Sequence, residues 1–257
     1  MGRKRKIITK TAIIIFLILP SVIFGAKPFN ETQPTEIVSM PTAGLIQKNN
    51  ASFKFTFFED GGINFALEFA PFNFLNLGLG YGGNNLIGEK KPSWNKKVDI
   101  LCRLRLINES FNFPALLVGF NSQGQAYYDG HRYMLKSPGI FLVGSKNYYA
   151  LGGDLSFHIG SNYSILEKYG GNSPDIFAGI IKELGPISLS SEYRTGFDES
   201  ECEGCKKEIG YLNLSLAFSF VGNNGRAEII FLDILNKNQY HKNLYRELRV
   251  SFTSRIF

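Results

Sequence analysis

Tyr211–Phe220 reads Tyr-Leu-Asn-Leu-Ser-Leu-Ala-Phe-Ser-Phe, and this stretch decides the fold class. Leucine or phenylalanine occupies every second position from Leu212 to Phe220, and asparagine, serine and alanine lie between them. Strict alternation with a period of two predicts a β-strand with one large apolar face and one small polar face. In a soluble sandwich the polar face would contact water. In a transmembrane barrel it would face the lumen, and the apolar face would contact lipid.

The same alternation recurs along the chain and predicts twelve strands, an even number. They span 52–58, 63–69, 74–82, 98–107, 113–121, 140–148, 154–163, 175–182, 186–194, 211–221, 226–235 and 246–257. After the first hairpin, short and long connections alternate, as tight periplasmic turns and longer extracellular loops do in outer-membrane barrels. We therefore predict an all-β fold, an antiparallel up-and-down transmembrane β-barrel in the outer membrane of a Gram-negative-type bacterium. A soluble periplasmic β-sandwich is the alternative fold.

Residues 1–26 have the composition of a secretory signal peptide. An apolar run over 12–19 follows a basic start and is too short for a comfortable membrane span. The basic residues are Arg3, Lys4, Arg5, Lys6 and Lys10. An uncleaved anchor is the alternative, and the cleavage site stays open. We expect a signal peptide over 1–26, a periplasmic lead-in segment over 27–50 and a barrel over 51–257.

The charge of the chain lies mostly in its first residues. The formal net charge is +6, and removal of the five basic residues of 1–26 leaves +1 for the remainder, which contains every aspartate and glutamate. Nucleic-acid binding therefore has no electrostatic support. Apolar residues make up 44% of the chain, which is enough for a full core in one all-β domain.

The three cysteines do not by themselves predict a metal site. Cys202 and Cys205 form a Cys-Glu-Gly-Cys motif, for which a small disulfide, two free thiols or a metal are alternatives. A four-ligand zinc site needs two further ligands, and the chain's three histidines are scattered. Cys102 alternates with apolar residues and is expected to be a small apolar side chain itself. We expect neither a metal nor another cofactor.

The predicted inward face collects charges of both signs. Its candidate residues are Lys54, Glu68, Asp99, Arg103, Arg105, Asp154, His158, Glu192, Arg194, Glu228 and Arg249. Opposite charges in a narrow lumen would pair and fill the barrel, or would line a passage for a small polar or saccharide solute. In the second case Arg103 and Arg105 would lie beside an anionic solute.

A catalytic role is not expected. His158 lies two residues from Ser156 on the presumed luminal face, which is the arrangement that has to be considered for a lipase. Phospholipid chemistry needs its nucleophile on the lipid-facing wall, and Leu155, Phe157 and Ile159 occupy that wall. His158 is better explained as a luminal residue that forms hydrogen bonds.

Aromatic residues mark the long loops and the end of the chain. Trp94, Tyr127, Tyr128 and Tyr133 suit an interfacial girdle, or alternatively stacking on sugar rings. Phe257 ends the chain with an aromatic residue, a feature that the barrel-assembly machinery recognises in many outer-membrane barrels. The partners expected are therefore outer-membrane lipid and this machinery, with no nucleic acid.

Several motifs extend over nearly the whole chain after residue 40. They are Pro41-Thr42-Ala43, the glycine-rich stretch 80–88, Pro92-Ser93-Trp94-Asn95, the stretch 114–120, Ser122-Gln123-Gly124, Ser137-Pro138-Gly139, the stretch 143–147 and the stretch 246–250. With these motifs the chain resembles a family of outer-membrane barrels related to the YjbH-like proteins, which are linked to exopolysaccharide and capsule loci. The resemblance implies a structural role or an association with surface polysaccharide and its export components. A small-solute pore and an outer-membrane enzyme are the alternative functions.

Overall fold

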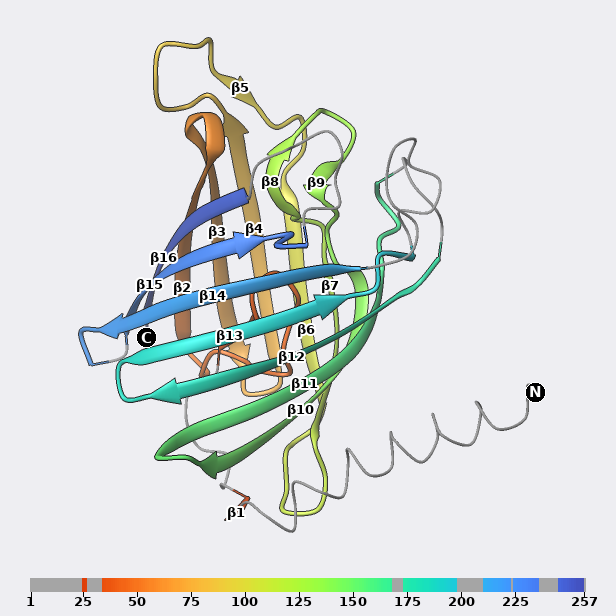
Figure 1. Ribbon diagram of the computed structural model, residues 1–257, viewed down its shortest axis with the longest axis vertical. Coiled ribbons are helices and arrows are strands. Elements are labelled where there is room, and N and C mark those ends of the chain that lie inside the picture. The colour runs from red at the N-terminus through yellow and green to blue at the C-terminus, as the bar shows by residue number, and fades with distance from the viewer. Residues whose placement is uncertain are drawn as a thin grey trace.

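The computed structural model describes residues 25–26, 34–167, 173–197, 210–222, 224–235 and 245–256. In these residues twelve strands pair antiparallel with their neighbours along the chain (Figure 1). The last strand pairs with the first, through Leu248 opposite Phe57, and the strand Ala115–Asn121 pairs with the strand Gly139–Ala150 across the intervening loop. The barrel is therefore closed, and no edge of the sheet is left to be hydrogen-bonded by lipid or water.

The strands of the barrel are tilted in Figure 1 and have similar lengths. They are β2 (Asn50–Phe58), β3 (Gly62–Phe72), β4 (Leu75–Asn84), β6 (Asp99–Ile107), β7 (Ala115–Asn121), β10 (Gly139–Ala150), β11 (Gly153–Tyr163), β12 (Asp175–Leu184), β13 (Ile187–Arg194), β14 (Tyr211–Phe220), β15 (Gly225–Leu232) and β16 (Tyr245–Arg255). This up-and-down order confirms the predicted fold class and strand number.

Strand β14 shows how the alternating pattern becomes a barrel wall. Leu214, Leu216 and Phe218 are 39%, 45% and 52% exposed, although leucine and phenylalanine normally lie in the core. Asn213 and Ser215 alternate with them and are buried inside the barrel. The polar face of the strand thus points inward and the apolar face outward, as expected for a strand that contacts lipid.

The apolar exterior continues around the barrel. Leu79 on β4, Ile100 on β6, Leu142 on β10 and Leu189 on β13 are all at least half exposed. A monomeric soluble protein rarely exposes such a continuous apolar surface, because its contact with water is unfavourable. The exterior is therefore a membrane-facing surface, and the chain is an outer-membrane β-barrel. Among the described residues, no helix is long and apolar enough to cross a membrane.

The connections differ between the two ends of the barrel. At one end the turns are short, and Leu151 and Gly152 both adopt positive φ angles of 50° and 74° between β10 and β11, the geometry of a tight hairpin turn. At the other end lie the longer loops, which carry β5 (Ser93–Trp94) and the pair β8 (Gln125–Tyr128) and β9 (Tyr133–Leu135). The short η1 (Glu59–Gly61) also lies at this end.

The N-terminal part differs from the expectation of a periplasmic lead-in segment over 27–50. Residues 34–46, called the inner segment below, lie inside the barrel, and Ile37, Val38 and Met40 are almost fully buried there. Upstream, β1 (Gly25–Ala26) pairs with the end of β10. The expected signal peptide lies outside the described residues except for Gly25 and Ala26, and the C-terminal Phe257 also lies outside them.

Candidate functional site

The inner segment folds back on itself within the lumen. Ile37 N donates to Met40 O at 2.8 Å, and Thr42 N donates to Thr35 O at 3.0 Å, so that the chain forms a tight loop. The side chains that hold this loop come from β2, β6, β10, β13 and β16, on different sides of the barrel. The segment therefore fills the centre of the lumen rather than covering one wall.

Glu192 on β13 binds the tip of the loop. Its Oε2 atom accepts hydrogen bonds from three successive backbone N–H groups, those of Val38 at 3.0 Å, Ser39 at 2.9 Å and Met40 at 2.7 Å. The hydroxyl of Ser39 also donates to Glu192, and Asn213 Nδ2 donates to its Oε1 atom at 2.8 Å. Successive N–H groups form a concave site for an anion, and hydrogen bonds to a charged acceptor are among the stronger ones in proteins.

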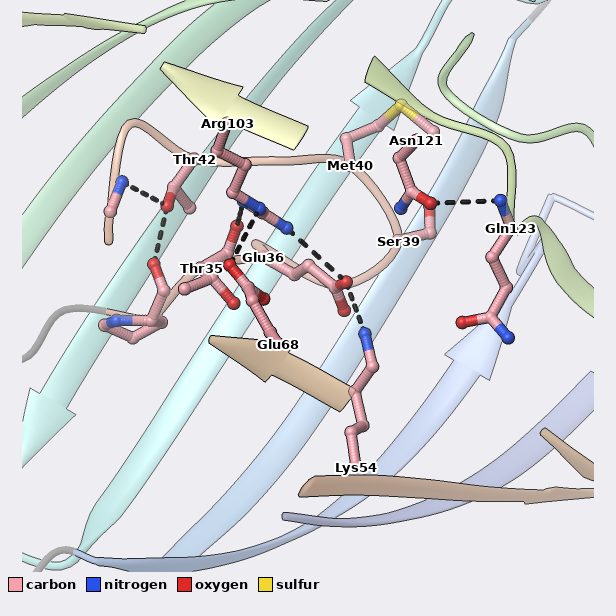
Figure 2. Close-up of polar contacts among 12 residues, drawn as sticks. Thr35, Glu36, Ser39, Met40, Thr42, Lys54, Glu68, Arg103, Asn121 and Gln123 are labelled. Atoms are coloured by element: carbon pink, nitrogen blue, oxygen red, sulfur yellow. Dashed lines mark hydrogen bonds and ion pairs between the residues drawn. The ribbon is translucent and has the colours of Figure 1, made fainter. Parts of the chain in front are cut away.

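Glu36, at the base of the loop, is surrounded by three cations of the wall. Its carboxylate lies 2.5 Å from Lys54 Nζ and 3.8 Å from Arg103 Nη2 (Figure 2). It also lies 3.1 Å from Arg249 Nη1. Burial acts to raise the pKa of Glu36, but the three cations outweigh it and lower the pKa to about 2. The carboxylate is therefore ionised in its place, and the segment is attached to three strands through one side chain.

The two arginines of β6 also hold the inner segment. Arg103 is fully buried, donates to Thr35 O at 2.5 Å and forms an ion pair with Glu68 at 3.4 Å (Figure 2). Arg105 donates to Ala43 O. If the lumen were a passage, these arginines were expected to lie beside an anionic solute. In this structure they bind backbone carbonyls of the chain itself.

The opposite part of the lumen is apolar. Ile37 belongs to one cluster of buried residues with Leu117 of β7, Phe141 of β10 and Phe177 of β12. Gly179 of β12 leaves room for it, because a Cβ atom at this position would lie 2.7 Å from Ile37 Cγ2. The lumen thus has a charged half and an apolar half, and the inner segment contacts both.

The long loop between β7 and β10, called the cap (residues 122–138), lies over the long-loop end of the lumen. Ala126 N donates to Glu247 Oε1 at 2.8 Å, and Tyr133 donates its hydroxyl proton to Asp99. Glu167 accepts from the backbone N–H groups of Tyr133 at 3.2 Å and Ser137 at 2.9 Å. Burial, with Asp99 next in effect, raises the pKa of Tyr133, so this tyrosine remains a hydrogen-bond donor.

A cavity of about 440 Å³ remains beside the inner segment. Its lining includes Gly152, Gly185 and Asn224, which belong to three of the short turns, and it extends inward to Glu36 and Lys54. The space therefore reaches from the short-turn end of the barrel to the group of charges around Glu36.

The candidate residues named from the sequence all come to the interior of the barrel. Asp99, Arg103, Arg105, His158, Glu192, Arg194, Glu228 and Arg249 are buried, while Lys54, Glu68 and Asp154 line the cavity. Several pair with each other or with a neighbour, as Arg249 does with Glu228 at 3.3 Å and Arg194 with Asp175 at 3.5 Å. Sequence reasoning missed Glu36, the partner that brings Lys54, Arg103 and Arg249 together.

The serine and histidine considered for catalysis do not form a pair. Ser156 donates to Asn147 Oδ1 at 2.6 Å, whereas His158 Nδ1 lies 2.8 Å from Ser145 Oγ. Ser145 in turn accepts from Ala43 N at 2.8 Å, so this pair also belongs to the contacts of the inner segment. The other ring nitrogen of His158 has no hydrogen-bond partner among the described residues, and no carboxylate orients the ring as in a catalytic triad.

The remaining candidates lie on the outer surface, in the cap or outside the described residues. Trp94 is 59% exposed and stacks on the outward-facing Tyr81 with 5.7 Å between ring centroids, as expected for an interfacial aromatic girdle. Tyr128 and Tyr133 are instead buried in the cap, and Lys97 lies over both rings. Cys202 and Cys205 lie outside the described residues, so their pairing stays a prediction.

No protein-family model matches the chain, and no curated protein matches it. Among solved structures, the outer membrane protein Omp33 of Acinetobacter baumannii is 7% identical with a TM-score of 0.41, covering 80% of this chain and 97% of its own. A triple mutant of the Rh. blastica porin is 10% identical with a TM-score of 0.32, covering 76% of this chain and 56% of its own. The chain thus spans little more than half the length of that porin. The similarity concerns the fold alone. The assignment of this chain as a membrane barrel is based on its own strand pairing and apolar exterior.

Proposed function

We propose that the protein is a gated pore for small solutes in the outer membrane, and that the described structure is its closed state. The inner segment is the gate. The observation that supports this is how the segment is held: in the described residues, no backbone hydrogen bond joins residues 34–46 to a strand of the barrel. Side-chain contacts alone hold it, so it can leave the lumen without any break in strand pairing.

The lumen wall fits a passage better than a permanent core. Strands β11, β13 and β14 present the hydroxyl groups of Ser156, Ser188, Ser190 and Ser215 to the interior. Burial of polar groups without complete pairing is unfavourable, and an interior that exists only to be filled is more stable when it is apolar. A polar inner wall is instead the usual lining of a water-filled barrel.

Conductance tests the proposal directly. Residues 34–46 would be replaced by a glycine-serine linker of the same length, and the purified barrel would be inserted into planar bilayers. We expect stable conductance steps for this variant and a closed state for the unmodified protein. Replacement of the exposed loop residues 88–91 by the same type of linker is the matched control and should leave the protein closed.

Folding of each variant is checked by the shift in electrophoretic mobility between heated and unheated samples, which reports a closed barrel. A linker variant that folds but stays silent contradicts the pore. That result favours a purely structural barrel. One observation supports this alternative, because Leu135 of the cap and Ile37 of the inner segment belong to one apolar cluster.

Association with surface polysaccharide is the function that the resemblance to YjbH-related barrels adds. The supporting observation is limited to exposed aromatic rings at the long-loop end, where Tyr127 is 49% exposed and Trp94 is 59% exposed. Such rings stack on sugars. A deletion strain with unchanged surface polysaccharide would remove this candidate. No catalytic step is part of the proposal.

A further inference from the structure

The barrel itself provides a binding position for one carboxylate. Lys54, Arg103 and Arg249, which surround Glu36, belong to β2, β6 and β16. Their positions are therefore set by strand pairing rather than by the inner segment. If the segment leaves, the three cations, of which Figure 2 shows Lys54 and Arg103, stay around the position that the carboxylate of Glu36 occupied.

The acidic residues of the wall replace Glu36 only in part. Glu68 pairs with Arg103 at 3.4 Å and Glu228 pairs with Arg249 at 3.3 Å, and the charges of Glu247 and Glu192 also act on Arg249. Among the described residues, however, Glu36 alone forms ion pairs with all three cations. Arg103 is fully buried, and its Nε and Nη2 atoms make no hydrogen bond among the described residues. A buried cation that loses a partner is strongly unfavourable, so the vacated position favours another anion.

An apolar surface lies directly next to this position. Ile37 and Val38 follow Glu36 in the chain and are buried in the cluster that includes Phe177 and Ile181 of β12. When the inner segment leaves, these wall residues lose their cover. The wall of the lumen without the inner segment is thus complementary to one carboxylate with an apolar group attached to it.

We infer that the lumen binds amphipathic monocarboxylates, with the carboxylate in the position of Glu36 and the apolar body in the position of Ile37 and Val38. The cavity provides access, because it reaches from the short turns to Glu36, Lys54 and Arg249. This inference rests on the proposed function in one respect, namely that the inner segment can leave its place. It specifies which small solutes the pore takes.

Calorimetric titration of the linker variant with hexanoate tests the inference. We expect saturable binding of hexanoate, at least about tenfold weaker binding of acetate and of hexanamide, and no binding of hexylammonium. Lys54→Gln should weaken hexanoate binding about tenfold, since it removes one of three charges at the site. Lys90→Gln is the matched control, because Lys90 pairs with Asp60 in an exposed turn.

The outcomes separate the two proposals. Equal binding of hexanoate and hexylammonium, or an unchanged affinity in Lys54→Gln, overturns the inference even if the linker variant conducts ions. A variant that is silent in bilayers but binds hexanoate selectively overturns the pore and leaves the inference standing.

A second measurement on the full chain covers the case in which the linker variant does not fold. It follows the reaction of a water-soluble thiol reagent with Ala43→Cys, after Cys102, Cys202 and Cys205 have been replaced by serine. Ala43 is fully buried in the closed state. Hexanoate should accelerate the reaction by displacing the inner segment, and hexanamide should not. Equal rates with both compounds contradict the inference.

Discussion

At the scale of single residues, Glu192 takes the place of the strand pairing that the inner segment lacks. Three backbone N–H groups of the segment would otherwise have no acceptor in the lumen, and an unpaired buried N–H group costs about 1–3 kcal/mol. One carboxylate accepts all three. These N–H groups at the tip of the loop are therefore all paired by a single side chain, and the stability of the tip depends on the charge and geometry of that side chain.

Glu192→Gln should loosen the inner segment. The glutamine has the same shape, but it is neutral, and its amide nitrogen cannot accept a hydrogen bond. The loss of charge-assisted hydrogen bonds should cost about 2 kcal/mol, so thiol labelling of Ala43→Cys should become about thirtyfold faster. Labelling tracks the population of the open form when opening and closing are fast. Glu89→Gln, in an exposed loop, is the isosteric control, and an equal rate in both variants would refute the role of Glu192.

At the scale of elements, the sequence predicts the strands well because each strand contains its own signal. In β14 the period-two pattern distinguishes the outward Leu216 from the inward Ser215, and the structure places both as expected. The same pattern brings Lys54, Arg103 and Arg249 to the inner face. Each of these predictions needs only neighbouring residues, since side chains alternate between the faces of any strand.

The inner segment could not be predicted in this way, because its contacts are not local. Ser39 binds Glu192, which is 153 residues away in the chain, and no periodicity marks such a contact. A signal was nevertheless present. The apolar pairs Ile37-Val38 and Leu45-Ile46 are unusual in a segment expected to be exposed to water, and they become buried in the lumen.

The fit between β12 and the inner segment gives a prediction at this scale. Gly179→Ala places a Cβ atom 2.7 Å from Ile37 Cγ2 and 2.7 Å from the backbone oxygen of Ser191, so neighbouring atoms have to move. Overpacking of this kind costs about 1–3 kcal/mol and should accelerate labelling of Ala43→Cys about tenfold.

Gly144→Ala is the matched control, because its Cβ atom has no neighbour closer than 3.5 Å. Addition of Ile37→Ala to Gly179→Ala relieves the side-chain contact. The labelling rate of the double variant is compared with the rate expected if the free-energy effects of the two single substitutions add. If the double variant is not labelled more slowly than this expectation, Ile37 and Gly179 are not coupled.

At the scale of the whole molecule, the inner segment fills the lumen and the cap lies over its long-loop end. The two segments differ in their connection to the barrel. The cap joins β7 and β10 and is fixed at both ends, with Glu167 and Glu247 binding its backbone. The inner segment continues into β2 at one end, and β1 upstream of it pairs with β10. No backbone hydrogen bond joins residues 34–46 themselves to a strand in the described part of the chain, so we expect the segment to move more readily than the cap.

The arrangement of the ends in the membrane follows from loop length. Short turns of outer-membrane barrels face the periplasm and longer loops face the medium, which places the cap outside the cell and the inner segment's entrance inside. In a chain whose three cysteines are replaced, Tyr127→Cys in the cap should react with a membrane-impermeant thiol reagent on intact cells. Leu151→Cys, at an 85% exposed position in a short turn, should react only after the outer membrane is permeabilised. The reverse pattern would place the entrance of the inner segment at the cell surface, and solutes would then meet Glu36 from outside before they meet the cap.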